Sequence, residues 1–341
     1  MTLEDVAREA NVHYSTVSRA LDPQKAFRVS EATRTRVQAI ARRLGYLPDV
    51  MASGLKRGRS QTVAVVVGDL TNPNVAPVLR GIAAGLEPRG LMPLICETHD
   101  DSERLEQILN LLLSRRIDAI LLSSATMRDG SLLRKIRGHN VPLVLAVQNC
   151  PGVRLPLCAY DDFLGGRLAA QHLLALGHRR LAQLRGPMDI TSCRDRAIGF
   201  SKTVEAAGAT EITVDGEAPT GSVEDGRRLM RKVLDRRRAL PTAIFNHHDL
   251  MAIGALKLAR EYGLRCPDDI SFVGYHDLPG IDEVVPPLTS IRLPREELGR
   301  VAAEMMLERL ASNERPVVQR RLTPTLVVRG STAAPPRTRR G

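Results

Sequence analysis

The stretch NVHYSTVSRAL, residues 11–21, decides how the first part of the chain folds. Val17, Ala20 and Leu21 recur at the spacing of one helix face, which predicts that they are buried. The opposite face is dense in side chains that form hydrogen bonds: His13, Tyr14, Ser15, Thr16, Ser18 and Arg19. Two interpretations are open at this point. The helix either presents its polar face to a partner, or belongs to a small bundle whose polar face is simply hydrated.

The neighbouring residues predict two more helices around this stretch. Thr2 can cap a helix over 3–10, with Asp5 three residues later as the reciprocal partner. Asn11 suits the left-handed conformation of a sharp turn into the helix over 13–21. Ser30 can cap a third helix that Gly45 ends. A helix, a tight turn, a second helix and a supporting third helix form the helix-turn-helix arrangement, in which the second helix enters the DNA major groove.

The positive charge of the chain lies mainly at its two ends. The formal net charge is +11, and residues 1–60 contain 11 Lys/Arg against 6 Asp/Glu. This distribution favours a protein whose N-terminal part binds a polyanion such as a nucleic acid. The alternative is that the basic surface is only solvated. Residues 47–60 are predicted to form a marginal hinge helix and linker, weakened by Gly54. Leu55 in this basic segment is either a packing contact or a wedge for a DNA minor groove.

From Thr62 onward, short apolar runs alternate with helical segments in two successive blocks. The first block has runs at 62–68, 91–97, 118–124 and 142–147, and the second at 180–184, 211–215, 242–246 and 269–275. Alternation of this kind predicts parallel sheets that are covered on both faces. Two blocks of similar size predict two lobes with a cleft between them, and ligands bind such sheets at the carboxyl ends of the strands.

Several other classes of protein are disfavoured by what the sequence lacks. No apolar run approaches the ~18 residues of a membrane span, and the N-terminus has no signal-peptide pattern. The 5 cysteines are scattered without a CxxC pair, so disulfides and structural zinc are not expected, and we infer a cytoplasmic protein without a cofactor. A secreted solute-binding protein would not need the first 60 residues. Catalytic motifs such as GxSxG or HExxH are also missing, so an enzyme is not expected.

Many blocks of this sequence, in order and at the right spacing, resemble the LacI/GalR family of transcriptional regulators. They include TLEDVAREANV, TVSRAL, VSEATRTRV, LGYLPD, GRSQTVAVVVGDLTNPN, RRIDAILL, LAAQHLLALGHRR, RAIGF, DLMAIGAL, PPLTSIRLP and LVVRGST. The resemblance implies an all-α helix-turn-helix headpiece, a hinge helix, and an α/β core of two Rossmann-like lobes that is similar to a periplasmic binding protein.

The expected domain bounds follow from the resemblance and the composition. They are 1–46 for the headpiece, 47–60 for the hinge, 61–330 for the core and 331–341 for a disordered basic tail. Lobe 1 is expected over about 61–160 and 291–322, and lobe 2 over about 161–290 and 323–330.

The resemblance also implies a function and its residues. It implies a homodimeric repressor, without a membrane partner, that binds double-stranded DNA at a palindromic operator under the control of a small-molecule effector. Tyr14, Ser15 and Arg19 would meet base edges, and Thr2, Thr16 and Ser18 would meet phosphates. Ala52 and Leu55 would enter the minor groove. His13, which stands where a small hydroxyl cap is usual, is also expected among the DNA-binding residues. An effector that shifts the lobes could release DNA by melting the weak hinge.

Several of the expected effector-binding residues depart from the family pattern. They are Asn74, Val147, Arg194, Arg196, His248 and His276. Sugar-binding members usually carry acids at the positions of Val147 and His276, so two carboxylates are lost while an arginine is kept. This change favours an anionic effector such as a sugar acid or sugar phosphate. A neutral sugar or nucleoside, or a pocket that is out of use, remains an alternative. A metal is not expected, because neighbouring histidines rarely direct both rings at one ion.

Overall fold

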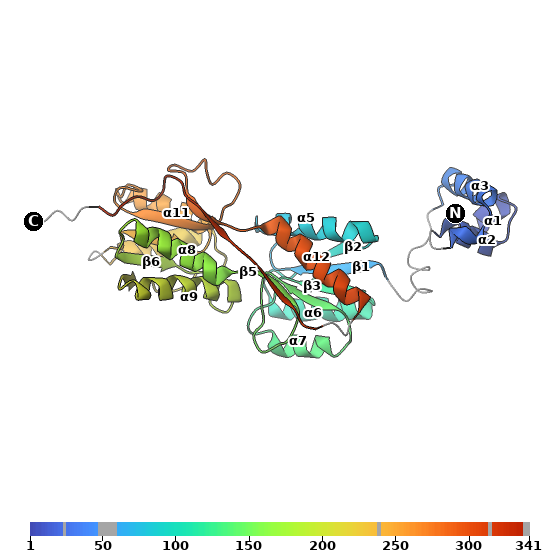
Figure 1. Cartoon of the computed structure of the whole chain (residues 1–341), viewed down its shortest axis with the longest axis horizontal. Helices are drawn as coiled ribbons and strands as arrows, with labels where there is room; N and C mark the ends of the chain where they lie inside the picture. Colours follow the sequence, from blue (N-terminus) through green and yellow to red (C-terminus); the bar gives the residue numbers. More distant parts are fainter. Residues whose placement is uncertain (23–24, 47–59, 237–239, 313–315, 337–341) are drawn as a thin grey trace, which may run out of the picture. The chain divides into compact units, whose positions relative to one another are not determined.

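The computed structural model describes residues 1–22, 25–46, 60–236, 240–312 and 316–336 (Figure 1). The chain divides into two compact units, Met1–Ser60 and Gln61–Gly341. Each unit has a hydrophobic core of its own.

The first unit is the predicted helix-turn-helix. Its elements are α1 (Leu3–Glu9), α2 (Tyr14–Leu21), the 3₁₀ turn η1 (Ala26–Arg28) and α3 (Glu31–Arg43). Thr2 and Asp5 form the predicted capping box at the start of α1. Asn11 has a φ of 49°, which makes the sharp turn between α1 and α2. The fully buried side chains of Val6, Val17 and Val37 join the three helices.

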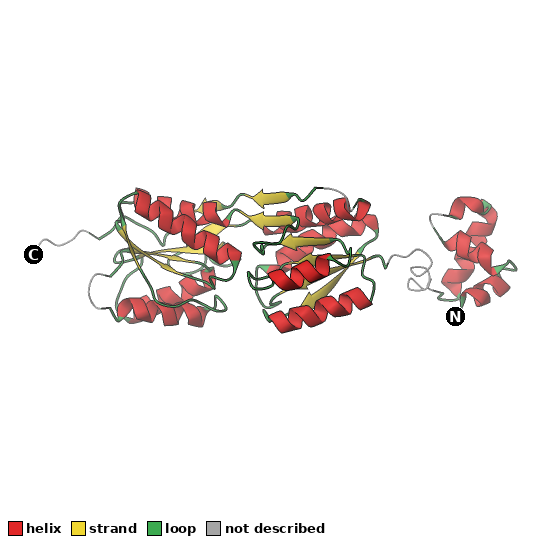
Figure 2. Ribbon diagram, turned by 90° about the horizontal axis from the view of Figure 1, so that it is seen from below, coloured by secondary structure: helices red, strands yellow, loops and turns green. Residues whose placement is uncertain are grey.

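The second unit contains two six-stranded sheets, which Figures 1 and 2 show at the centres of two lobes. In lobe 1 the strand order is β11-β5-β4-β3-β1-β2, and all pairings are parallel. These strands are β1 (Thr62–Val67), β2 (Met92–Glu97), β3 (Ala119–Leu122), β4 (Leu143–Ala146), β5 (Leu157–Tyr160) and β11 (Gln319–Leu322).

In lobe 2 the strand order is β12-β10-β9-β8-β6-β7, and β12 alone pairs antiparallel with its neighbour in this described sheet. The strands are β6 (Arg180–Leu184), β7 (Thr210–Ile212), β8 (Ala243–Asn246), β9 (Ser271–His276), β10 (Thr289–Arg292) and β12 (Thr325–Val327). Because β10 continues to Arg292, lobe 2 extends two residues beyond the expected bound at 290.

Helices cover both faces of each sheet, as the apolar runs predict. In lobe 1 they are α5 (Val75–Leu86), η2 (Glu87–Arg89), α6 (Ser102–Ser114), α7 (Gly130–Arg137) and α12 (Arg295–Ala311). In lobe 2 they are α8 (Asp162–Ala175), α9 (Thr191–Ala206), α10 (Val223–Leu234) and α11 (Asp249–Glu261). Alternate residues of a strand pack on opposite faces: Val63 and Val65 share a core with α5 and α12, whereas Ala64 and Val66 share one with α6 and α7.

The expectation of a disordered tail from residue 331 is wrong for residues 331–336. Ser331 is fully buried, and its hydroxyl donates to the Phe272 carbonyl (2.6 Å) and accepts from the Thr289 N–H (2.8 Å). The Ala333 carbonyl accepts a hydrogen bond from His178 Nε2 (2.9 Å). Composition suggested disorder, but the backbone of lobe 2 offers this segment partners for its polar groups. Residues 337–341 lie outside the described part of the chain.

Replacing Ser331 should reveal how strongly this segment holds lobe 2 together. Ser331→Ala should lower the free energy of unfolding by about 1–3 kcal/mol, because a buried N–H and a buried carbonyl lose their partner. Denaturant unfolding followed by circular dichroism measures the change, with Ser131→Ala on the exposed side of α7 as the matched control. Equal stability of the two variants would contradict the assigned role of the segment.

Candidate functional site

The N-terminus of α2 is capped by an imidazole instead of a hydroxyl. His13 Nδ1 accepts from the backbone N–H of Ser15 (3.3 Å) and lies 2.8 Å from the Ser15 hydroxyl. The ring centroid of His13 is 4.3 Å from that of Tyr14. His13 therefore satisfies one of the free N–H groups of the first turn and also orients the start of α2.

The outer face of α2 carries the side chains that the sequence singles out. Tyr14 is 52% exposed, and Ser18 and Arg19 are also exposed, whereas Ser15 and Thr16 are half-buried. The Thr2 hydroxyl is already occupied in the capping box with Asp5 (3.0 and 3.2 Å). Burial of Val17 and Ala20 against the other helices fixes which face of α2 points outward. Ala52 and Leu55 lie outside the described residues, so their predicted contacts remain predictions.

A cavity of about 140 Å³ lies in the second unit, where strands of both sheets end. Residues at or just after the ends of β1, β2, β3, β4 and β5 line it from lobe 1, and residues of α9, β9 and the β8–α11 junction line it from lobe 2. This is the place where open α/β sheets bind ligands. Of the residues predicted to bind an effector, the cavity brings together Asn74, Val147, Arg196, His248 and His276.

Arg194 does not line this cavity, contrary to the prediction. Its Nη1 lies 3.2 Å from the sulfur of Met127, and its Nε lies 3.8 Å from a carboxylate oxygen of Asp195. The reason is the helical geometry of α9, because residues two positions apart point to different sides of a helix. Arg194 and Arg196 therefore cannot both face the cavity.

Lobe 2 gives the cavity a polar wall, which consists of Ser192, Arg196, His248 and His276. Arg196 makes the central contacts of this wall. It is 3% exposed, and its Nε and Nη2 each lie 2.9 Å from Asp162 Oδ1. Its Nη1 donates to the His247 carbonyl (2.6 Å), and its guanidinium carbon lies 3.8 Å from the ring centroid of Tyr275. Burial alone would lower the pKa of Arg196, but the Asp162 carboxylate prevails and keeps that pKa above its ordinary value. Its positive charge is thus compensated inside the protein.

The close approach of α8 and α9 makes this ion pair possible. A Cβ on Gly166 of α8 would stand 2.0 Å from the Arg196 carbonyl, so only glycine fits there. Tyr275, from β9, donates its hydroxyl to the same carboxylate oxygen of Asp162 (2.8 Å). Three elements of lobe 2 therefore meet at one carboxylate.

Three histidines close to Arg196 have lowered pKa values, and two of them, His248 and His276, line the cavity. His247 Nδ1 accepts from the Gly186 N–H (3.2 Å) and its Nε2 donates to Gln183 Oε1 (2.9 Å), an arrangement that only an uncharged ring can form. Burial, followed by the Arg196 cation, lowers the pKa of His248 to about 3. Burial, followed by His248, lowers the pKa of His276 well below its ordinary value. The rings of His248 and His276 lie 4.4 Å apart between centroids.

Sequence reasoning missed several residues of the lobe 1 wall: Asp69, Asp100, Ser123 and Tyr160. Partial burial, with the neighbouring carboxylates of Asp69 and Glu97, raises the pKa of Asp100. Asp69 and Asp100 lie two and three residues after the ends of β1 and β2, and that position was the signal available in the sequence. Tyr160 was missed because β5 was not anticipated as a strand.

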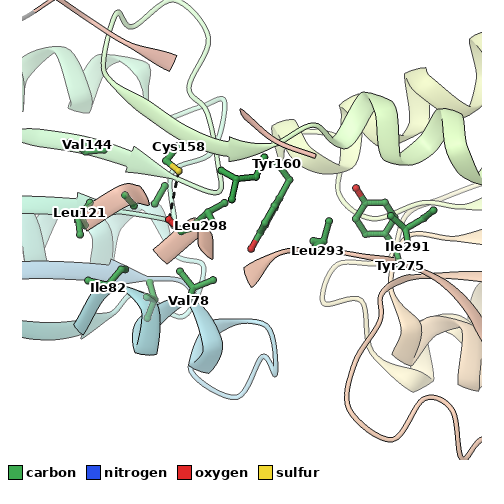
Figure 3. Close-up of a cluster of buried hydrophobic side chains, with 14 of the residues drawn as sticks. Val78, Ile82, Leu121, Val144, Cys158, Tyr160, Tyr275, Ile291, Leu293 and Leu298 are labelled. Carbon is green, nitrogen blue, oxygen red and sulfur yellow. Dashed lines mark hydrogen bonds between the residues drawn. The ribbon is translucent and has the colours of Figure 1, made fainter. Parts of the chain in front are cut away.

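Two buried polar atoms on the cavity wall have no hydrogen-bond partner among the described residues. They are the hydroxyl of Tyr160, on lobe 1, and Nδ1 of His276, on lobe 2. Figure 3 shows the Cys158 thiol bonded to the Leu298 carbonyl, whereas no such bond is drawn to the nearby Tyr160 hydroxyl. Buried polar groups normally have partners, so these two atoms are candidates for contacts with a ligand.

The backbone is also unusual on both sides of the cavity. Val147 has a φ of 67° and His276 a φ of 104°. Positive φ values are rare for side chains with a Cβ, most of all for a β-branched residue such as valine, and they concentrate at ligand sites.

The part of the chain that the structure describes contains no group of three or more His, Cys, Asp or Glu side chains suited to a metal ion. Within the same described ranges, no helix has the length and apolar character needed to cross a membrane.

Comparisons with known proteins agree with this architecture. Residues 2–49 match the family model of bacterial regulatory proteins of the lacI family, and residues 170–332 match the periplasmic binding protein-like domain. The chain is 33% identical to the HTH-type transcriptional repressor CytR of Escherichia coli (strain K12) over 339 residues, which is 98% of this chain and 97% of CytR.

Solved structures agree as well. The lac repressor dimer bound to operator and the anti-inducer ONPF matches with a TM-score of 0.86 at 27% identity, over 98% of this chain and 99% of that one. The regulator CelR in complex with cellobiose matches with a TM-score of 0.74 at 30% identity, over 97% and 99% of the two chains. Shared sequence over nearly the full length, together with the shared fold, shows that the chain belongs to the LacI/GalR family of transcriptional regulators.

Proposed function

We propose that this DNA-binding regulator is a homodimeric repressor of a palindromic operator, controlled by an uncharged, hydroxylated small molecule that binds between the two lobes. The observation that carries the effector class is the buried Arg196–Asp162 pair. Because Asp162 compensates the only arginine that lines the described cavity wall, the site does not offer an anion a free cation.

The charges around the cavity support a neutral ligand over the anion that the sequence favours. His248 and His276 are uncharged near neutral pH, and the other ionisable groups on the wall include the carboxyl groups of Asp69 and Asp100. An anion would lose hydration without gaining a charged partner, which is costly in a buried site. The unpartnered Tyr160 hydroxyl and His276 ring can each bond to a ligand hydroxyl. Cellobiose, bound by the related CelR, is also an uncharged molecule with many hydroxyl groups.

The headpiece supports the DNA-binding half of the proposal. Tyr14 and Arg19 project from the exposed face of a helix whose other face is locked by Val17. The planar guanidinium of an arginine can bond to both acceptors on the major-groove edge of guanine. We propose that Arg19 reads bases, with Tyr14 and Ser15 beside it, and that Thr2, Thr16 and Ser18 contact phosphates.

Arg19→Ala tests the base-reading role. Binding to a specific operator, selected from a random library with the full-length protein, should weaken about 5- to 150-fold, which corresponds to a loss of about 1–3 kcal/mol. Binding to random duplex should change far less. Arg42→Ala, an exposed arginine of α3, is the matched control. Equal losses on both kinds of DNA would show that Arg19 contacts only phosphate.

A ligand panel tests the effector class. Neutral sugars and nucleosides, but not sugar acids or sugar phosphates, should raise the thermal midpoint of the purified protein. A ligand at about 100 times its Kd stabilises the folded state by about 2.7 kcal/mol, which is readily seen by scanning calorimetry. Stabilisation by the acids or phosphates alone would overturn the neutral-ligand proposal and restore the anionic one.

The buried histidines predict acid sensitivity. Each has a lower pKa in the folded state than the ordinary value of about 6.5, so below that pH the unfolded chain binds protons that the folded chain does not. Stability should therefore fall as the pH drops through about 6.5, by up to about 1.4 kcal/mol per pH unit for each histidine. Burial raises the pKa of Asp249 to about 7, so this carboxyl group takes up its proton more readily in the folded state than in the unfolded state. Asp249 therefore adds stability as the pH falls and reduces the total loss caused by the histidines.

His276→Asn isolates one of these contributions. Asparagine tolerates positive φ, so the turn is kept while one titrating group is removed. The loss of stability between about pH 7.5 and about pH 5.5, measured by urea unfolding, should be smaller in the variant. His139→Asn, at an exposed position, is the control, and identical pH profiles for all three proteins would contradict the assignment.

A further inference from the structure

We propose that Gln148 is a positioning residue that caps helix α9 from the opposite lobe, and so holds the polar wall of the effector cavity against lobe 1. The inference rests on the proposed function, because the wall that Gln148 positions is the one assigned to the effector. It concerns how that site is regulated, and it assigns a role to Gln148, which does not itself line the cavity.

Helix α9 begins without a cap from its own segment. Ile190 occupies the N-cap position, where no side-chain hydrogen bond is formed in the described structure. The first N–H groups of a helix have no partner within the helix and need one from elsewhere. Here the partner comes from lobe 1. The N–H of Ser192 donates to Gln148 Oε1 (3.4 Å), and Gln148 Nε2 donates to the Ser192 hydroxyl (3.0 Å).

A second pair of contacts reinforces this cap. The backbone N–H of Asn149 donates to the Thr191 hydroxyl (2.9 Å), and that hydroxyl lies 3.4 Å from Gln148 Oε1 and 3.3 Å from the Asn149 carbonyl. Residues 148 and 149 follow β4 of lobe 1, whereas Thr191 and Ser192 open α9 of lobe 2. The polar groups of the two segments therefore satisfy one another across the lobe boundary.

A strained turn places Gln148 in this position. The Gln148 N–H donates to the Ala146 carbonyl (2.7 Å), and the residue between them, Val147, has a φ of 67°. A hydrogen bond between residues two apart around a positive φ is the γ-turn that proteins rarely use, because it is strained. The turn directs the chain out of β4 so that Val147 lines the cavity and the next side chain reaches α9.

The cap is thus adjacent to the cavity on both sides. Val147 lines the cavity immediately before Gln148, and Ser192, which Gln148 contacts, lines it together with Arg196 one helical turn later. A ligand that contacts these residues would therefore affect the hydrogen bonds that join the two lobes. By comparison, the nearby ion pair of Arg128 and Asp189 (3.0 Å) is exposed, with Arg128 79% accessible, and contributes little.

The experiment compares Gln148→Leu with Gln148→Glu in the full-length protein without added ligand. Leucine keeps the size of the side chain and removes the cap. Glutamate keeps the acceptor, and its negative charge suits a helix N-terminus. Hydrogen–deuterium exchange of the backbone amides in the first turn of α9, at Ser192, Cys193 and Arg194, reports the cap. We expect roughly tenfold faster exchange in Gln148→Leu, the size of effect that loss of an N-cap gives, and protection close to wild type in Gln148→Glu.

Two further variants complete the design. Thr191→Val removes the hydroxyl that accepts from the Asn149 N–H, so it should raise exchange at the Asn149 amide and, by loosening the cap, at the first turn of α9. It replaces Gln148→Leu in the comparison if the leucine variant fails to fold. Gln171→Leu, at an exposed position of α8, is the matched control and should leave α9 unchanged. Unchanged exchange in both Gln148→Leu and Thr191→Val, or equal increases in Gln148→Leu and Gln148→Glu, would overturn the proposal.

A functional readout separates this proposal from the one on which it rests. The affinity for the selected operator should differ from wild type at least threefold in Gln148→Leu and should return to the wild-type value in Gln148→Glu. If wild-type protein fails to select any operator, the proposed function is wrong, while the exchange data still decide the role of Gln148. If α9 is protected by Gln148 but operator affinity is identical in all variants, the regulatory part of the inference is wrong.

Discussion

The buried ion pair between Arg196 and Asp162 is the interaction on which the rest of the candidate site depends. It ties α9 to α8, and Tyr275 brings β9 to the same carboxylate. Removing one partner of such a pair leaves an uncompensated buried charge, which destabilises the fold far more than replacing both partners with apolar residues of similar volume. The pair also affects the neighbouring residues His247 and His248. It places the Arg196 guanidinium against the His247 carbonyl, and its cation helps to keep His247 and His248 neutral.

The cavity follows from the way in which two parallel sheets end at the same boundary. Lobe 1 contributes mostly apolar side chains from β1, β3 and α5, and lobe 2 contributes Ser192, Arg196, His248 and His276. A ligand with a hydroxylated part and a less polar part can satisfy both walls at once. The lobes are also joined directly, through the Gln148 cap and through Arg295, which donates to Asn74 in lobe 1 (3.2 Å) and to the Asp277 carbonyl in lobe 2 (3.1 Å). The boundary that lines the cavity is therefore already held together by hydrogen bonds between the lobes.

Local sequence signals were sufficient for the headpiece and for most elements of the core. Caps, the left-handed Asn11 and apolar periodicity act over a few residues, so the roles of Thr2, Ser30 and Val17 follow from the residues beside them. Strand β5, strand β10 and helix α7 were missed because their runs are short and lack clear boundaries. The buried tail was missed for a related reason. The composition of residues 331–336 is that of a disordered segment, and only the folded lobe 2 supplies partners for the Ser331 hydroxyl and for the backbone of Ser331 and Ala333.

The sequence by itself determined the family, the helix-turn-helix, the two-lobed α/β core and five of the positions that line the cavity. Tertiary structure alone decided the electrostatic character of that cavity. Counting arginines and histidines suggested a site for an anion, but charge depends on what each group touches. Asp162 is 34 residues from Arg196 in sequence and 2.9 Å away in space, and burial removes the charge from the histidines. Helical geometry likewise turned Arg194 away from the site, because a residue's partners depend on the face it occupies as well as on its place in the chain.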